Sequence, residues 1–214
     1  MKKFFNISGL FIAIFAVTAF TSCNNDNEPN NRFTITASNV QACGCSRVNR
    51  IATVKATLFH RGETFVVGEA PFRNRGFNMT LATDIPSLFL FPVEWLEDIG
   101  TLDINNRYAN IAVLGVEGFV AFDRDGEINK MARTSTAYYY ALWIYADRNV
   151  TVRGSYTSSW GSESHYDLNL RSGWNAVFLR VEFDKNYSSI HTSTLTTQRP
   201  NNVTFVWEFS CGLD

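Results

Sequence analysis

Apolar and polar residues alternate with a period of two along most of this chain. The stretches FTITA (33–37), IATVKATLF (51–59), TFVVGEA (64–70) and GFNMTLA (76–82) show the pattern in the first half, and short Gly-containing turns separate the last three. A period of two sends successive side chains to opposite faces of a β-strand, and short turns favour hairpins. The first half therefore predicts a meander of antiparallel strands.

The second half repeats the pattern and extends the predicted sheet. Its spacing of roughly 8–15 residues between strands is typical of sandwiches, and strand–helix–strand alternation, which would build a parallel sheet, does not occur. We therefore predict an all-β fold, an antiparallel β-sandwich built as one structure or as two packed sub-sandwiches. The strands predicted in this half are 108–116, 117–123, 136–146, 149–156, 165–170, 174–183 and 203–209.

One proline-broken segment interrupts the strands. Pro86 and Pro92 fall within DIPSLFLFPVEWLEDIG (84–100), where VEWLEDI (93–99) predicts one or two helical turns. We expect this short helix to cap an open end of the sheet. Residues 84–104 are also the candidate sub-boundary within a β-sandwich domain that spans residues 33–214. Four strands before that boundary bury little apolar surface, which favours one continuous structure or two tightly packed halves.

The first residues have the pattern of a bacterial lipoprotein signal. A positive start is followed by the apolar run LFIAIFAVTAF (10–20), which is too short to span a membrane, and then by two small residues before Cys23. This predicts a signal peptide over residues 1–22 and a lipid-modified Cys23. The polar stretch CNNDNEPNN predicts a disordered tether over residues 23–32. The alternative is an ordinary cleaved signal with an incidental Cys23.

Lipidation would determine where the protein resides. Two or three acyl chains, palmitate among them, give stable membrane anchoring, so the membrane is an expected partner through the N-terminal lipid. The expected location is the cell envelope, as an outer-membrane lipoprotein. Asp26 and Glu28 resemble the surface-export signal of Bacteroidetes lipoproteins. That resemblance implies a surface-exposed protein, although the residues themselves leave the surface and periplasmic faces both open.

Charge and composition narrow the class of partner. The formal net charge is −1, and loss of Lys2 and Lys3 with the signal peptide would make it −3. The arginines are scattered rather than gathered in a basic patch, so no nucleic-acid partner is expected. Aromatic residues make up 14% of the chain, which favours strands over helices. No cofactor is implied.

Three cysteines follow Cys23 in the sequence. Cys43 and Cys45 form a CGC motif, whose two thiols would close a strained ring if they bonded to each other. A disulfide from Cys43 or Cys45 to Cys211 is more plausible, because first and last strands are often neighbours in sandwiches and export permits disulfides. Three buried thiols are the alternative. The spacing lacks the usual two-residue gap of a zinc site, so no metal is predicted.

The acidic and histidine residues give weak evidence for catalysis. DRDGE (123–127) is predicted as a solvated hairpin turn rather than a calcium loop. The three histidines show no spacing typical of a catalytic triad, and Ser164 and Asp167 in SHYD are too common a local pattern to indicate one. A carboxylate-dependent glycoside hydrolase stays a second alternative. Its candidate acids are Glu94, Glu97 and Asp98.

Aromatic residues are the main candidates for a binding site. YYYALWIY (138–145) is aromatic or apolar on both faces, which indicates a central strand covered on both sides. Alternatively, Tyr139 and Trp143 line an exposed face that stacks on sugars or anchors a protein. Trp160 lies in the polar loop SYTSSWGSES together with Tyr156, and it either folds back on the core or contacts a ligand.

Several motifs carry a family resemblance. VKATLF, VVGEAPF, GFNMTLA, NVTVRG and LRSGWNAVFLRV together resemble uncharacterised all-β surface or periplasmic lipoproteins of Bacteroidetes bacteria. The resemblance implies the fold and location given above and supplies no activity. We therefore expect a non-catalytic module that binds a glycan or a protein. The alternative is a structural accessory subunit of an envelope complex.

Overall fold

The protein is almost entirely β-structure, as its alternating sequence predicts. The computed structural model describes residues 32–43, 49–96, 102–115, 118–124, 126, 128–134, 138–158, 161–184 and 190–210. In this part of the chain no helix reaches seven residues, and the strands form packed, mostly antiparallel sheets in a sandwich-like arrangement. None of its helices is long and apolar enough to cross a bilayer. The predicted fold class is confirmed.

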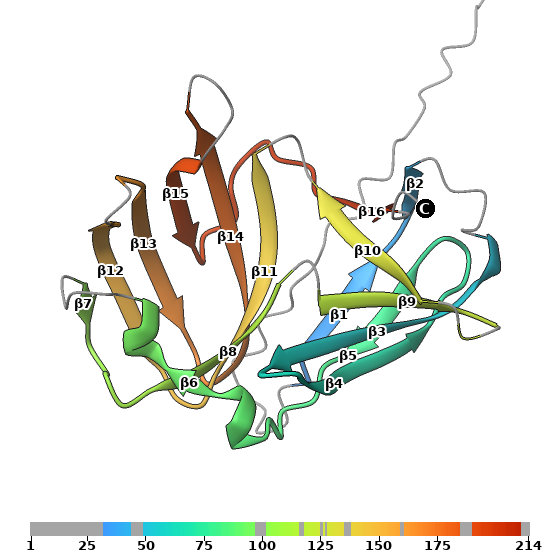
Figure 1. Cartoon of the computed structure of the whole chain (residues 1–214), viewed down its shortest axis with the longest axis horizontal. Helices are drawn as coiled ribbons and strands as arrows, with labels where there is room; N and C mark the ends of the chain where they lie inside the picture. Colours follow the sequence, from blue (N-terminus) through green and yellow to red (C-terminus); the bar gives the residue numbers. More distant parts are fainter. Residues whose placement is uncertain are drawn as a thin grey trace, which may run out of the picture.

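The first half of the chain contributes three strands of a six-stranded sheet and both strands of a small two-stranded sheet. The two-stranded sheet pairs β1 (Thr34–Ala37) with β5 (Phe77–Thr80), and both lie with the six-stranded sheet on the right of Figure 1. In spatial order the six-stranded sheet contains β2 (Gln41–Cys43), β16 (Val206–Ser210), β10 (Ile128–Thr134), β9 (Phe119–Asp123), β3 (Ile51–His60) and β4 (Glu63–Pro71).

The second half forms an eight-stranded sheet that curls on itself, on the left of Figure 1. Its two edge strands, β6 and β7, are consecutive in the chain, so the segment between them bridges the two edges. In spatial order the sheet contains β6 (Phe91–Pro92), β8 (Asn110–Leu114), β11 (Tyr139–Ala146), β14 (Gly173–Phe183), β15 (Ile190–Thr196), β13 (Glu163–Leu170), β12 (Val150–Thr157) and β7 (Asp103–Ile104).

Two short 3₁₀ helices occupy the proline-broken segment, η2 (Ser87–Phe89) and η3 (Val93–Leu96). The predicted helix at 93–99 is therefore confirmed as a single 3₁₀ turn in its described part. Val93 is fully buried and Leu96 packs beside it. We call residues 91–104 the strap, because this segment joins the two edges of the curled sheet.

Two strand pairs are parallel, which the sequence did not predict. β2 runs parallel to β16, and β15 runs parallel to β13. The second pair arises because β13 and β14 are joined by a short turn but are not neighbours in the sheet. β15 lies between them and pairs with β13 on one side and with β14 on the other. The turn that joins them is the predicted one, with Gly173 at a φ of +96° that favours glycine.

The side chain of Asn175 holds the turn between β13 and β14. Its carboxamide accepts a hydrogen bond from the backbone N–H of Arg171 at 2.9 Å and donates to the Arg171 carbonyl at 2.7 Å. These bonds satisfy backbone groups at the turn that would otherwise lack ladder partners. In the motif RSGWN, Gly173 therefore adopts the positive φ of the turn and Asn175 bonds to its backbone.

A core rich in aromatic rings lies between the two halves. We call it the aromatic core. Phe119 on β9 is at its centre, with ring centroids 5.2 Å from Trp143 on β11 and 5.0 Å from Trp207 on β16. The indole of Trp174 on β14 donates a 2.6 Å hydrogen bond to the Ala82 carbonyl in the first half. This core therefore draws on residues from both sides of segment 84–104.

A second core fills the inside of the curled sheet. We call it the aliphatic core, because its buried members in the described chain are all Val, Leu, Ile or Ala. Strand β11 separates the two cores. Leu142 and Ile144 face the aliphatic core, whereas Trp143 and Tyr145 face the aromatic core. The prediction of a central strand covered on both sides is thus the correct one for this segment.

The turn near Gly126 differs in one respect from the expected solvated hairpin tip. Gly126 has a φ of +82°, as the turn requires. Asp123, however, is only 6% exposed, and its carboxylate lies 3.1 Å from the guanidinium of Arg50. A carboxylate removed from water needs such a cationic partner. Asp125 and Glu127 lie outside the described residues.

Candidate functional site

The structure separates the aromatic residues that the sequence suggested as ligand contacts. Trp143 is 7% exposed and stacks on Trp207 at 5.7 Å and 13°. Its ring is therefore packing in the aromatic core, and the idea that it contacts a ligand is corrected. Tyr139 lies beneath the guanidinium of Arg180, 5.9 Å from its ring centroid. Trp160 lies outside the described residues.

Tyr156 is on the other face of the curled sheet from Tyr139. The strand register forms one row of directly paired residues across the sheet, and paired residues share a face. The row runs from Tyr139 through Arg180, Thr194 and His165 to Ser155. Tyr156 is the next residue after Ser155, so it points to the inner face, where it packs against the aliphatic core. These two tyrosines cannot contact one small ligand together.

Two strongly exposed aromatic rings lie instead on the strap and on the loop beside it. Trp95 in η3 is 63% exposed, and Tyr108 in the loop before β8 is 84% exposed. A tryptophan with that much of its ring in water is unusual, because indole is among the most buried side chains on average. We call these two rings and their polar neighbours the Trp95–Tyr108 surface.

Backbone pairing brings the two segments together. Pro92 is paired with Asn110 in the β6–β8 ladder, and the Val93 N–H donates to the Ala109 carbonyl at 2.9 Å. One residue after Val93 and two residues before Ala109, the Glu94 carboxylate and the Arg107 guanidinium lie 3.5 Å apart. The two exposed rings are therefore the immediate sequence neighbours of one ion pair.

The geometry of η3 explains why Trp95 points outward. A 3₁₀ helix has three residues per turn, so Val93 and Leu96 lie on one side of it. Both pack into the aliphatic core, which leaves Glu94 and Trp95 on the solvent side. The Trp95 ring then stacks on Phe91 with centroids 5.8 Å apart and an interplanar angle of 16°. Phe91 itself packs on the aliphatic core, so the exposed indole rests on a fixed support.

The loop that carries Tyr108 is held by side-chain hydrogen bonds on both sides. Asn105 accepts from the Thr151 N–H at 2.8 Å, and the Asn106 amide donates to the Asn149 carbonyl at 3.3 Å. After Tyr108, the Asn110 side chain donates to the Asp147 carboxylate at 3.0 Å. These bonds hold the loop backbone, so little conformational entropy is lost if a ligand covers the ring.

A second ion pair lies on the far side of this loop. Arg148 donates two hydrogen bonds to the Asp147 carboxylate, at 3.0 and 3.1 Å. Burial alone would raise the pKa of Asp147, but the hydrogen bonds from Arg148 and Asn110 outweigh it and lower the pKa below its ordinary value. Asp147 is therefore ionised at neutral pH and fully paired with Arg148.

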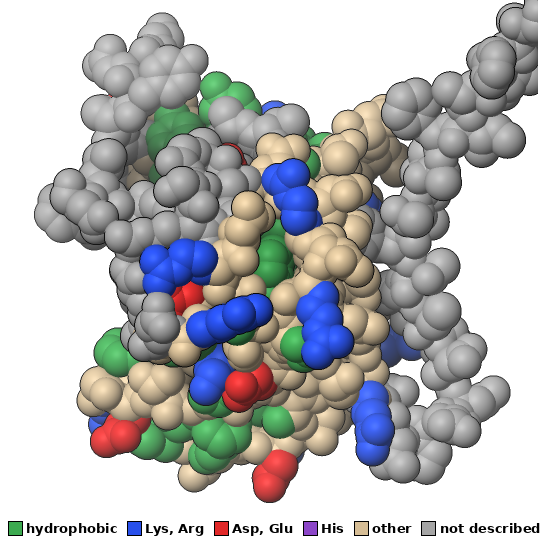
Figure 2. Space-filling model, turned by 90° about the vertical axis from the view of Figure 1, so that its right-hand side faces the viewer, with side chains coloured by type: hydrophobic (Ala, Val, Ile, Leu, Met, Phe, Trp, Pro, Cys, Tyr) green, Lys and Arg blue, Asp and Glu red, His purple; other side chains and the backbone are tan. Residues whose placement is uncertain are grey.

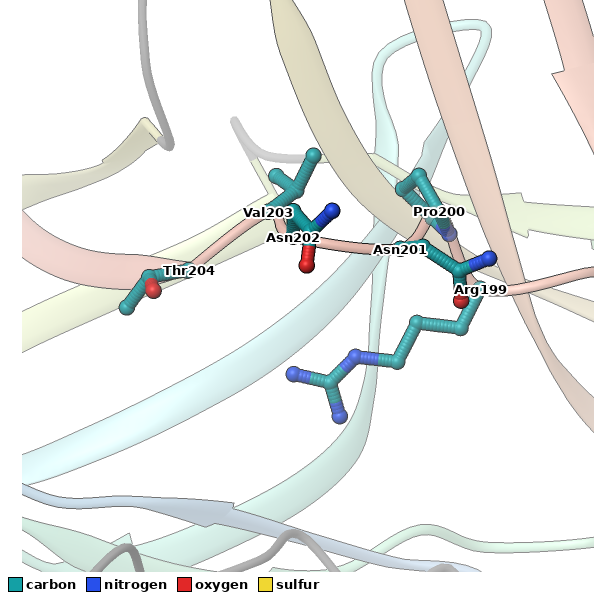
Figure 3. A pocket seen from close by; sticks show the side chains of 6 residues that line it. All are labelled: Arg199, Pro200, Asn201, Asn202, Val203 and Thr204. Atoms are coloured by element: carbon teal, nitrogen blue, oxygen red, sulfur yellow. The ribbon is translucent and has the colours of Figure 1, made fainter.

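A pocket among the described residues lies elsewhere. It has a volume of about 520 Å³ and follows the loop between β15 and β16. Figure 3 shows the long side chain of Arg199 extending to the opposite side of the loop from Val203. Its described lining contains no aromatic ring that could stack on a ligand. The residues are Arg199, Pro200, Asn201, Asn202, Val203 and Thr204.

The side of the molecule on which the six-stranded sheet lies has a mixed surface. Figure 2 shows Lys and Arg side chains interspersed with Asp and Glu, and hydrophobic side chains between them. Lys55 on β3, for example, lies 3.5 Å from the Glu69 carboxylate and 5.0 Å from the centroid of the Phe122 ring. Phe59 near the end of β3 is 73% exposed, so it is a second exposed ring with which Trp95 can be compared.

A serine, a histidine and a carboxylate do meet on the outer face of the curled sheet. The Ser155 hydroxyl lies 2.7 Å from His165 Nδ1, and His165 Nε2 lies 3.5 Å from the Glu163 carboxylate. The serine that contacts His165 thus comes from the paired strand β12, not from the adjacent Ser164, which bonds to Ser193 on the inner face. All three groups are solvent-accessible on an open strand surface, where water competes for the contacts that a hydrolytic centre must preorganise.

Other candidate groups for chemistry are not brought into one site. Glu94 is engaged with Arg107, and its proposed companions Glu97 and Asp98 lie outside the described residues. In the described part of the chain, no three His, Cys, Asp or Glu side chains converge on a position for a metal ion. Cys23, Cys45 and Cys211 also lie outside the described residues.

The fold and this surface define an all-β protein with a supported, exposed aromatic platform. Neither a protein-family model, nor a curated protein, nor a solved structure matches the chain.

Sequence reasoning missed both rings of this surface. Trp95 was assigned to a short capping helix, and Tyr108 to the start of a strand. A usable signal was present at Trp95. Val93 and Leu96 are the apolar pair of a three-residue turn, so a tryptophan between them, next to Glu94, has no buried face available. Tyr108 carried no comparable signal, because tyrosine is ordinary at the start of a strand.

Proposed function

We propose that this protein is a lipid-anchored glycan-binding module of the cell envelope, and that it binds through the Trp95–Tyr108 surface. The observation that carries the proposal is the Trp95 indole, which is 63% exposed and yet lies flat on Phe91. Sugar rings bind proteins by stacking their C–H faces on such aromatic platforms while polar neighbours contact their hydroxyls. A ring already held in place gains that contact area at low entropic cost.

The polar groups beside the platform suit the same ligand. Glu94 and Arg107 supply carboxylate acceptors and guanidinium donors next to both rings, and Asn106 adds an amide. Fixed donors and acceptors around an aromatic platform are the usual composition of small-molecule sites. A protein partner would also be drawn to exposed tryptophan and tyrosine. We favour glycan because charged and amide groups, those of Glu94, Arg107 and Asn106, flank the two rings.

The test is a binding screen of the purified protein on a glycan array, followed by affinity measurements. Trp95→Ala should weaken the binding by about tenfold or more, which is the size expected for a central aromatic contact. Phe59→Ala removes an equally exposed ring from the other half and is the matched control. Binding that survives Trp95→Ala unchanged would contradict this site. Binding to proteins but to no glycan would contradict the ligand class.

The anchor part of the proposal is supported by residues 1–23 of the sequence, not by the described structure. We expect the mature protein to begin at Cys23 with a diacylglycerol thioether and to fractionate with the outer membrane. Intact-mass analysis of the native protein reads out the modification directly. Cys23→Ala should release the protein from the membrane fraction, and an N-terminus at another residue would contradict the proposed anchor.

A further inference from the structure

The charges beside the Trp95–Tyr108 surface are already neutralised within the protein. Arg107 is paired with Glu94, and Arg148 is paired with Asp147 through two hydrogen bonds. In the described residues around Tyr108, each guanidinium thus has a carboxylate partner. A carboxylate or sulfate on a ligand would have to compete with an internal anion for each of these cations.

The sequence next to Trp95 adds negative charge only. Glu97 and Asp98 follow Leu96, and no Lys or Arg occurs between Arg75 and Arg107. Any field that these residues contribute repels an anionic ligand. The sequence that adjoins Trp95 therefore supplies no cationic cluster of the kind that proteins use to recognise acidic glycans.

The two rings also belong to separate segments. Trp95 is on the strap and Tyr108 is on the loop before β8, and the Glu94–Arg107 ion pair joins their neighbouring residues. A single pyranose ring covers one aromatic face. Contact with both rings therefore requires a ligand with more than one sugar unit, whose hydroxyls can then meet the ion pair that joins the two segments.

From these observations we infer that the surface takes an uncharged oligosaccharide of at least two sugar units. The inference rests on the proposed glycan-binding function and narrows it to a ligand class. Recognition is by ring stacking and by hydrogen bonds from paired side chains, with no net charge attraction. Such binding is insensitive to salt, because screening weakens interactions between net charges far more than stacking.

The experiment measures binding of the purified protein to neutral and anionic polysaccharides at 50 and 500 mM NaCl. Galactomannan, xylan and laminarin are the neutral probes, and polygalacturonate and heparin are the anionic ones. We expect binding to at least one neutral probe, with a Kd that changes by less than about twofold over this salt range. Trp95→Ala and Tyr108→Ala should each weaken it by about tenfold, and Phe59→Ala should leave it unchanged.

Two further measurements test the need for two sugar units and the effect of the Glu94–Arg107 ion pair. A tetrasaccharide from the bound polymer should bind at least tenfold more tightly than its monosaccharide, as two stacking positions require. Glu94→Gln removes the carboxylate partner of Arg107, so it should create or strengthen salt-sensitive binding to polygalacturonate. Equal affinity for monosaccharide and tetrasaccharide would overturn the two-ring arrangement. An unchanged response of Glu94→Gln to polygalacturonate would overturn the argument from paired charges.

The outcomes separate this inference from the function on which it rests. Salt-sensitive binding of the wild-type protein to anionic glycans alone, abolished by Trp95→Ala, would overturn the uncharged class and keep the glycan-binding function. Binding to none of the probes and to no glycan on the array would overturn both. If neither Trp95→Ala nor Tyr108→Ala changes the Kd for the neutral polysaccharide, the proposed site is wrong.

Discussion

The two cores of this protein are built from different kinds of side chain. The aromatic core lies between separate sheets and contains Phe77, Phe119, Trp143 and Trp207 in mutual contact. The aliphatic core lies inside one curled sheet, and its buried members among the described residues are all aliphatic. Packed sheets are about 10 Å apart, so large rings suit the space between them. The interior of the curled sheet is filled by branched aliphatic side chains instead.

The difference between the two cores helps to distinguish aromatic rings that pack the interior from rings that could bind a ligand. Rings in the aromatic core are packing material, as Trp143 shows by its burial against Trp207. Around the aliphatic core, no buried position takes a ring in the described chain, and Trp95 and Tyr108 lie at its outer margin with most of their surface in water. An exposed ring at the margin of the aliphatic core, unlike a ring packed against it such as Tyr156, is therefore the better indicator of function here.

The largest expected effect comes from emptying the centre of the aromatic core. Phe119→Ala removes a fully buried ring that contacts both Trp143 and Trp207, and it should lower the free energy of unfolding by about 3–5 kcal/mol. Because this core takes residues from both halves, the whole protein should lose stability in one transition. Urea unfolding followed by near-UV and far-UV circular dichroism measures both properties.

Leu168→Ala is the matched change in the aliphatic core. Leu168 is also fully buried, and its loss should cost about 2–5 kcal/mol. If the halves are one cooperative unit, both variants shift the same single transition to lower urea. Two separate transitions, one sensitive to Phe119→Ala and the other to Leu168→Ala, would show that the aromatic core does not couple the halves.

A disulfide is the next largest expected effect, and it concerns only the six-stranded half. The parallel β2–β16 ladder places Cys43 opposite Ser210, the residue before Cys211. The eight-stranded sheet contains no cysteine. We predict a disulfide from Cys43 or Cys45 to Cys211 in the exported protein, worth about 2–4 kcal/mol of stability. Non-reducing peptide mapping identifies the pairing, and Cys211→Ser should abolish the bond. A free thiol at Cys211 in the native protein would refute the prediction.

The alternation of the sequence predicted most of this fold but not its two parallel pairs. The strong strands at β3, β4, β11, β12 and β14 begin and end close to their predicted limits, because one or both faces are buried and the pattern is clear. β15, with the sequence IHTSTLT, was missed because its residues are polar and β-branched with no apolar alternation. Its stability comes from two neighbours, β13 and β14, and long-range pairing of that kind leaves no local signal.

The candidate site was predicted less well than the fold. The expectation that an exposed aromatic surface is the binding site stays a prediction, and the structure moves its centre from Tyr139, Trp143 and Tyr156 to Trp95 and Tyr108. Exposure depends on which side of an element meets a core. The apolar pair Val93 and Leu96 indicates that side for Trp95, whereas no local pattern indicates it for Tyr108. The meeting of Ser155 with His165 was equally hidden, since it follows from strand register alone.

The smallest expected effect tests the polar link between the two halves. The Trp174 indole donates to the Ala82 carbonyl, and Trp174→Phe keeps an aromatic ring while it removes the donor. Leaving a partly buried carbonyl without this bond should cost about 1–2 kcal/mol. Trp95→Phe is the control, because Trp95 is exposed and should change stability by less than about 0.5 kcal/mol. Hydrogen exchange adds a direct measure, since the indole N–H of Trp174 should exchange far more slowly than that of Trp95. Equal exchange rates, or a Trp174→Phe variant as stable as the wild type, would mean that packing of the aromatic core alone joins the halves.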